Sequence, residues 1–189
     1  MKDFWPLIEQ FQTGGTKSAQ AEWLRRGLLC RTKTDVEDFY LWVAVRLKEI
    51  NSYDMYGAFY NCFGIGSLDG FFEFQPWLIT LGRDVFISVA SNPDNLIDIP
   101  QVRFLLHLLE SGRGWSFENS PAFGELDIVI CDAYTMLEGD VKYLDDIVSL
   151  HGLNASIFEL EGHQWDIDDQ NQVRVRLPKI YRYKYQENT

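Results

Sequence analysis

The chain has 189 residues, enough for one domain with a substantial apolar core, and 46% of them are hydrophobic. Its 28 Asp and Glu against 17 Lys and Arg give a formal net charge of −11, which disfavours nucleic acid and anionic membranes as partners. The same charge suits a basic protein partner, although an acidic exterior can also serve solubility alone. An aromatic fraction of 15% argues against disorder.

The cysteines and the start of the chain bear on the compartment. Cys30, Cys62 and Cys131 are odd in number and far apart, which predicts free thiols in a reducing cytoplasm. Asp3 and Glu9 interrupt the beginning of the chain, so we expect no signal peptide. No apolar run reaches membrane length. The sequence therefore predicts a cytoplasmic protein without membrane contact.

Helical periodicity, interrupted by capping and breaking residues, runs through the chain before residue 64. Gly14-Gly15 separates the first helix from the second. Thr34 and Glu37 have the form of a capping box, in which each side chain accepts a hydrogen bond from the backbone N–H of the other. The predicted helices cover residues 3–12, 16–29, 34–51 and 53–63.

The run from Cys62 to Leu96 is the densest in large apolar residues, and we expect the rest of the chain to pack around it. Ser67 can cap a helix over residues 67–81 that is apolar on most sides and therefore central. Pro76 lies inside this helix and predicts a kink near Phe72. A second helix over residues 83–90 is expected to end at Asn92-Pro93.

Beyond Pro93 the elements are less clearly marked. Pro100 opens a helix that Ser111-Gly112 ends, and a loop is expected over residues 113–121. Residues 123–138 fit either a helix or a strand, because LDIVIC is strongly β-prone. A further helix is predicted over residues 140–150.

The tail is also ambiguous. Residues 157–160 are a candidate for a short extended piece. Val173, Val175 and Leu177 alternate with arginines, which is a strand pattern, yet Asp168 or Asp169 can cap a helix there. Taken together, the chain predicts a mainly α, single-domain multi-helix bundle around a central Pro-kinked helix. At most a minor extended or β segment is expected near the C-terminus, with a core of residues 1–150 and an extension of residues 151–189 packed on it.

Several motifs in this sequence resemble one known family. They are Phe4-Trp5-x-Leu7-Ile8, Tyr53-Asp54-Met55-Tyr56-Gly57-Ala58, Ser67-x-Asp69-Gly70-Phe71, Phe74-x-x-Trp77-Leu78-Ile79-x-x-Gly82-Arg83, Pro93-Asp94-x-Leu96 and Trp165-Asp166 through Asp168-Asp169 to Leu177-Pro178. Together they resemble the bacterial domain-of-unknown-function family forty-two forty. The resemblance implies a mostly helical fold, with helices over residues 123–138 and in the tail, and it implies no activity.

The sequence departs from the family pattern at two positions. The family has Ser-Asp-Asp where this chain has Leu68 in the middle, and Arg where this chain has Gln75. If the acid and the Arg form a functional pair in relatives, this chain lacks both. If they only cap and brace the helix, little changes.

The candidate chemistry is sparse. His163 with Asp166, Asp168 and Asp169 is an oxygen-rich cluster that a divalent cation could use, although it lacks the glycine turn and distal Glu of an EF-hand loop. Helix capping or a solvated loop is the competing interpretation. There is no zinc signature, no Gly-x-Ser-x-Gly elbow and no dinucleotide loop, so we expect no cofactor.

Two functional hypotheses follow. The first is a non-enzymatic acidic interaction protein, for example a cytoplasmic immunity protein that neutralises a basic toxin domain. Its contact residues would be aromatic and acidic side chains in predicted loops, since exposed aromatics are typical binding hot spots: Trp115, Phe117, Trp165, Asp166, Asp168 and Asp169. The competing interpretation is that the aromatic side chains pack onto the helices of the domain itself. The alternative is a metal-dependent hydrolase that uses His163 with the same three aspartates.

Overall fold

A computed structural model describes residues 2–11, 15–153 and 159–187. Within these ranges the chain is helical, and its β pairing is a single bridge, so the prediction of a mainly α fold is confirmed. The α-helices are α1 (Trp5–Phe11), α2 (Lys17–Leu29), α3 (Lys33–Ile50), α4 (Tyr53–Phe63), α5 (Leu68–Thr80), α6 (Arg83–Ser91), α7 (Pro100–Glu110), α8 (Glu125–Met136), α9 (Val141–Leu150), α10 (Gln170–Arg176) and α11 (Pro178–Arg182). Short 3₁₀ turns η1 (Pro93–Asp98) and η2 (Phe117–Asn119) and a π turn η3 (Tyr183–Glu187) complete the described elements.

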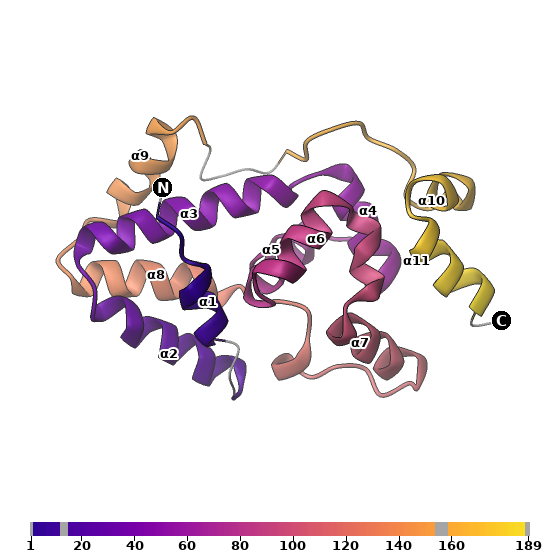
Figure 1. The fold of residues 1–189 in the computed structure, drawn as a ribbon, viewed down its shortest axis with the longest axis horizontal. Coiled ribbons are helices and arrows are strands. Elements are labelled where there is room, and N and C mark those ends of the chain that lie inside the picture. The colour runs from indigo at the N-terminus through magenta and orange to yellow at the C-terminus, as the bar shows by residue number, and fades with distance from the viewer. Residues whose placement is uncertain (1, 12–14, 154–158, 188–189) are drawn as a thin grey trace.

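The molecule is elongated in the view of Figure 1. The helices α2, α3, α8 and α9 make one end, where α2 packs along α8 and where α8 and α9 both pack on α3. The helices α4, α5, α6 and α7 form the middle, and α10 and α11 close the other end. Residues 170–187 therefore lie far from α8 and α9, although they follow them in the chain.

Local caps explain why most helices begin where they do. The Ser67 hydroxyl accepts a hydrogen bond from Gly70 N at 3.1 Å, as predicted for the start of α5. The start predicted for α3 was wrong by two residues. The observed capping box joins Thr32 and Asp35, whose side chains each accept from the other's backbone N–H at 3.1 Å. The sequence holds two overlapping Thr-x-x-acid patterns, and the first of them forms the cap.

The core centres on α5, as predicted. Phe71, Phe74 and Leu78 are fully buried and Trp77 is buried, and the Phe74 ring lies 4.8 Å from the Phe59 ring of α4. Aromatic pairs of this geometry add to the stability that burial alone gives. The helix runs through Pro76 without interruption, while the kink near Phe72 stays a prediction.

The ambiguous segments are helices. Residues 125–136 form α8 and residues 170–176 form α10. In the tail, Val173 is fully buried while Val175 is 77% exposed, so the valines lie on different faces of a helix. Of the extended piece expected over residues 157–160, residues 157–158 lie outside the described part of the chain and residues 159–160 form no strand. One parallel bridge joins Ser52 to the neighbouring Glu161.

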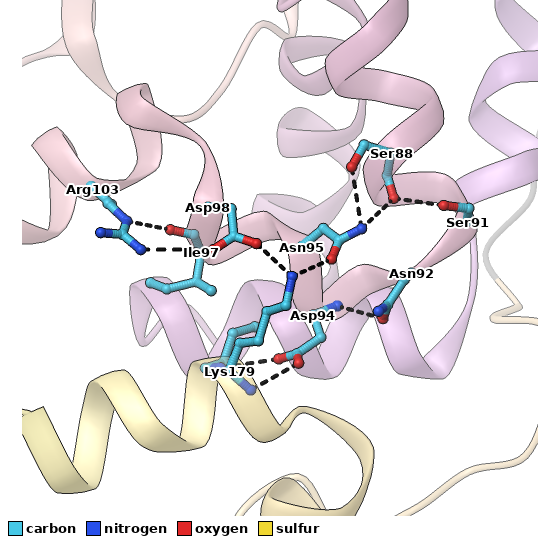
Figure 2. A network of polar contacts seen from close by, with 10 residues as sticks. Ser88, Ser91, Asn92, Asp94, Asn95, Ile97, Asp98, Arg103 and Lys179 are labelled. Atoms are coloured by element: carbon cyan, nitrogen blue, oxygen red, sulfur yellow. Dashed lines mark hydrogen bonds and ion pairs between the residues drawn. The ribbon is translucent and has the colours of Figure 1, made fainter.

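A buried carboxylate attaches the end of the chain to the middle of the molecule (Figure 2). Asp94 of η1 is 2% exposed, and its two oxygens accept hydrogen bonds from the backbone N–H groups of Lys179 and Ile180 at 2.8 and 3.0 Å. These are free N–H groups of the first turn of α11, so Asp94 caps a helix that lies 85 and 86 positions further along the chain. The Lys179 ammonium reaches Asp98 at 2.6 Å and Asn95 at 2.8 Å.

The two departures from the family pattern have separate surroundings. Leu68 is 41% exposed at the first position of α5, and the Ser67 cap forms beside it. Gln75 is buried and donates a hydrogen bond to the Asn51 side chain at 3.1 Å. Asn51 in turn donates to the backbone carbonyl of Glu159 at 2.8 Å. Gln75 therefore braces the segment that leads into the tail.

Candidate functional site

The three aromatic side chains proposed for partner contact differ in exposure. Phe117 is 61% exposed, and the Lys17 ammonium lies 5.1 Å from the centre of its ring. Trp115 is partly buried and packs edge-on against Phe63 at 5.7 Å. The loop that carries both is tied to α2, since Lys17 Nζ donates to Ser120 Oγ at 2.7 Å. Phe117 is thus held in place on the surface.

Trp165 is buried, so it packs onto the helices of the domain itself and is not exposed as a contact residue would be. Its ring lies against Gly57 of α4, where a Cβ atom would overlap the ring. The Arg176 guanidinium covers it at 5.4 Å from the ring centre. Trp165 therefore fastens the tail to α4, and a partner could not reach it without detaching that segment.

The three aspartates each have a local structural role. Asp166 Oδ1 accepts from Asp168 N at 3.0 Å, and Asp168 Oδ1 accepts from the Tyr60 hydroxyl at 2.6 Å. Asp169 caps α10 by accepting from Asn171 N at 2.8 Å, and this hydrogen bond holds the pKa of its carboxyl below the usual value. The aspartates thus begin α10 and tie it to α4.

The alternative metal site was predicted at His163 and these aspartates. His163 is exposed. Across residues 2–11, 15–153 and 159–187, no group of three or more His, Cys, Asp or Glu side chains is placed to hold a metal ion. The hydrolase stays a prediction that elemental analysis of the purified protein would test, since a stoichiometric transition metal would favour it.

The acidic residues are concentrated in one segment of the chain. Between Arg113 and Arg174 the sequence has thirteen acidic residues and one basic residue, Lys142. This segment accounts for all of the net charge of −11, and the remainder of the chain is nearly neutral. Seven of the thirteen acids lie on α8, on α9 or between them. The α8 and α9 helices on the left of Figure 1 are therefore acidic, while five further acids, Glu159, Glu161, Asp166, Asp168 and Asp169, lie in the segment that leads to and begins the tail at the other end.

Large apolar side chains are exposed among these acids. Ile128 and Met136 on α8 are 59% and 60% exposed, and Tyr143 and Leu150 on α9 are 48% and 81% exposed. We give the name α8–α9 surface to these four side chains and the exposed aspartates around them: Asp127, Ile128, Asp132, Met136, Tyr143, Asp145, Asp146 and Leu150. Arg25 of α2 borders this surface, since its guanidinium donates to Met136 Sδ at 3.4 Å. Exposed apolar groups among charged ones are typical of protein-binding surfaces.

The packing of α8 and α9 on α3 brings like charges together. Partial burial and the nearby Asp145 raise the pKa of the Asp127 carboxyl. The Tyr40 hydroxyl of α3 donates to Asp145 at 3.4 Å, and burial with the two carboxylates raises the pKa of this tyrosine. A cation placed here would relieve the repulsion between Asp127 and Asp145.

Reasoning from the sequence misses this surface, because Asp145-Asp146 by itself reads as ordinary surface charge. The sequence signal that could have located this surface is the position of Tyr143 and Leu150. Both lie outside the inward stripe formed by Leu144 and Val148, so that α9 is apolar on parts of both faces.

No helix among the described residues is both long enough and apolar enough to cross a membrane.

These features define a mainly helical protein with an acidic, partly apolar surface on α8 and α9. The model of one family, described as protein of unknown function (DUF4240), matches residues 1–136. The chain belongs to this family, and the resemblance seen in the sequence is confirmed. The tail motif from Trp165 to Pro178 lies outside the match and stays a prediction. Comparison with curated proteins finds no match, and comparison with solved structures finds none either.

Proposed function

We propose that the protein is a non-enzymatic interaction protein whose α8–α9 surface binds a basic protein partner. The observation that carries this proposal is the concentration of acidic residues between Arg113 and Arg174, together with exposed Ile128, Tyr143 and Leu150. The acids steer a basic partner to the surface, and the apolar side chains contribute affinity once water is excluded.

A specific form of this function is a cytoplasmic immunity protein that neutralises a basic toxin domain. The support is the small size of the chain, 189 residues, its acidity and the group of seven acidic residues on α8, on α9 and between them. A rigid acidic surface can cover a cationic active site and hold it by many weak contacts, because charge complementarity raises association rates and disfavours wrong partners.

A pull-down from the native host tests the proposal. The wild-type chain is compared with a variant in which Asp132, Asp145 and Asp146 are changed to Asn. A matched control, Glu9→Gln/Asp69→Asn/Asp84→Asn, removes the same charge from exposed positions elsewhere. We expect the wild type and the control to retain a basic protein at low salt, and the α8–α9 variant to lose it.

The captured protein is then purified and titrated against all three forms. Because screening weakens contacts between exposed charges, binding should weaken between about 0.05 and 0.5 M NaCl. If no basic protein is recovered, or if the α8–α9 variant binds it as tightly as the control does, the proposal is wrong. For the immunity form, co-expression with the toxin gene should relieve growth arrest in the wild type and not in the α8–α9 variant.

A further inference from the structure

A cavity of about 280 Å³ lies between α4, α7 and the end of the chain, remote from the α8–α9 surface. Its apolar lining includes Leu106 and Leu109 of α7 and Ile180 of α11. The buried Cys62 thiol adds to this lining, since burial raises its pKa to about 12 and keeps it protonated. A buried, protonated thiol behaves as a small apolar group. Most of the cavity wall therefore suits an apolar ligand.

An exposed cation, the Lys184 ammonium, forms one part of the wall. Asn61 is 5% exposed, and its side-chain NH₂ donates to the carbonyls of Gly57 and Ile167 at 3.0 and 3.1 Å. Both donors are used, so Asn61 Oδ1 is held as an acceptor and binds the Lys184 ammonium at 3.3 Å. The ammonium has two further protons for a ligand.

An anion lines the same cavity. One oxygen of the Glu110 carboxylate accepts a hydrogen bond from the Tyr183 hydroxyl at 3.0 Å, which joins α7 to η3. A carboxylate can accept several hydrogen bonds, so it can also receive a cationic group. Among the described residues that line the cavity, Lys184 and Glu110 are the charged ones, and their charges are opposite.

We propose that this cavity binds a free α-amino acid with an aliphatic or aromatic side chain. The ligand carboxylate pairs with Lys184, its ammonium group pairs with Glu110, and its side chain lies against Leu106 and Leu109. A simple anion is disfavoured by Glu110 and by the net charge of −11, and a simple amine is disfavoured by Lys184. A zwitterion satisfies both groups. The volume falls just below the range of roughly 300–1,000 Å³ for drug-sized ligands, which fits a small one.

Binding is coupled to the end of the chain, because Ile180, Tyr183 and Lys184 all line the cavity. A ligand held by these residues stabilises the docked form of α11 and η3 over any detached form. Slower hydrogen exchange in residues 178–186 on ligand addition is therefore expected, with little change in α2 or α8.

Calorimetric titration of the full chain tests the proposal with leucine and phenylalanine as probes. Two analogues each lack one charge: 4-methylpentanoate lacks the ammonium group, and 3-methylbutylamine lacks the carboxylate. We expect an amino acid to bind once per chain and each analogue to bind roughly tenfold or more weakly, because each loses a charge-assisted hydrogen bond. Methyl resonances of Leu106 and Leu109 should shift on binding.

The matching variants are Lys184→Met and Glu110→Gln, each expected to weaken amino-acid binding roughly tenfold or more. Arg182→Met is the control, since Arg182 is exposed on the adjoining turn and does not line the cavity. Binding of the two analogues is measured on the wild-type chain. The test of the proposal therefore does not depend on whether Lys184→Met or Glu110→Gln detaches the tail. The proposal is overturned if no probe gives heat or methyl shifts at millimolar concentration, or if 4-methylpentanoate binds as tightly as leucine.

Discussion

Asp127 illustrates how a single ionised side chain can lower the stability of the fold. Its carboxyl lies near that of Asp145, and burial with this neighbouring charge raises its pKa. The folded-state pKa therefore exceeds the unfolded value, so ionised Asp127 opposes folding above its folded pKa. This penalty disappears as the pH falls below the unfolded pKa of about 3.9.

Asp127→Asn should consequently stabilise the protein at neutral pH. We expect its melting temperature to exceed that of the wild type by about 1–2 °C at pH 7, a small effect because solvent screens a partly exposed group. The difference should shrink to zero near pH 3, where the wild-type carboxyl is protonated. Thermal denaturation of both forms between pH 3 and 8 measures this, and a less stable variant at pH 7 would contradict the account.

Gly57 tests the contact that fastens the tail. A Cβ atom at this position would overlap the Trp165 ring, so Gly57→Ala should destabilise the protein by about 1–3 kcal/mol despite the lower entropy of its unfolded chain. When Trp165 is first changed to Leu, Gly57→Ala should lower the free energy of unfolding by much less. Urea unfolding of the four proteins gives the coupling energy, and additive effects would show that the two residues do not meet.

At the scale of elements, the helices that local signals specify were predicted from the sequence. Thr16, Ser52, Ser67 and Asp140 each cap the helix that follows, and a cap lies within three residues of the group it satisfies. The end of the chain was harder to predict. The helix α11 and the π turn η3 were not foreseen, because the cap of α11 is Asp94, which no local pattern connects to Lys179.

Asp94→Ala should therefore loosen the C-terminal element. It removes the acceptor of two backbone N–H groups in α11, at an expected cost of about 1–2 kcal/mol, and hydrogen exchange in residues 178–186 should quicken. Asp98→Ala is the matched control. Asp98 is exposed and pairs with Lys179 and Arg103 at the surface, so its loss should cost under about 1 kcal/mol. Equal effects of the two changes would refute the capping role of Asp94.

At the scale of the whole molecule, charge is distributed unevenly along a mainly helical chain. Composition predicted the acidity, and periodicity predicted the helices, but neither placed the acids. The α8–α9 surface arises because both helices pack on α3, and which faces then remain exposed depends on contacts far apart in the sequence. The packing partner of Trp165 could not be located for the same reason, since nothing in the sequence near residue 165 points to Gly57.

Self-repulsion among these acids predicts how stability responds to salt. Raising NaCl from about 0.01 to 0.3 M at pH 7 shortens the Debye length from about 30 Å to below 10 Å and should raise the melting temperature by a few degrees. The rise should be smaller in the Asp132→Asn/Asp145→Asn/Asp146→Asn variant. A melting temperature that falls with salt would mean instead that ion pairs such as Arg176 with Asp54 outweigh the repulsion.

The anchoring of the C-terminal segment has a practical consequence for truncation. The family match ends at residue 136, so a shortened chain for expression could be designed to end at that position. Asn51, Asp94 and the face of α4 at Gly57 all lie before that point, yet each contacts a group beyond residue 158. A fragment ending at residue 136 would leave an amide, a carboxylate and an apolar groove uncovered, and we expect it to aggregate on expression.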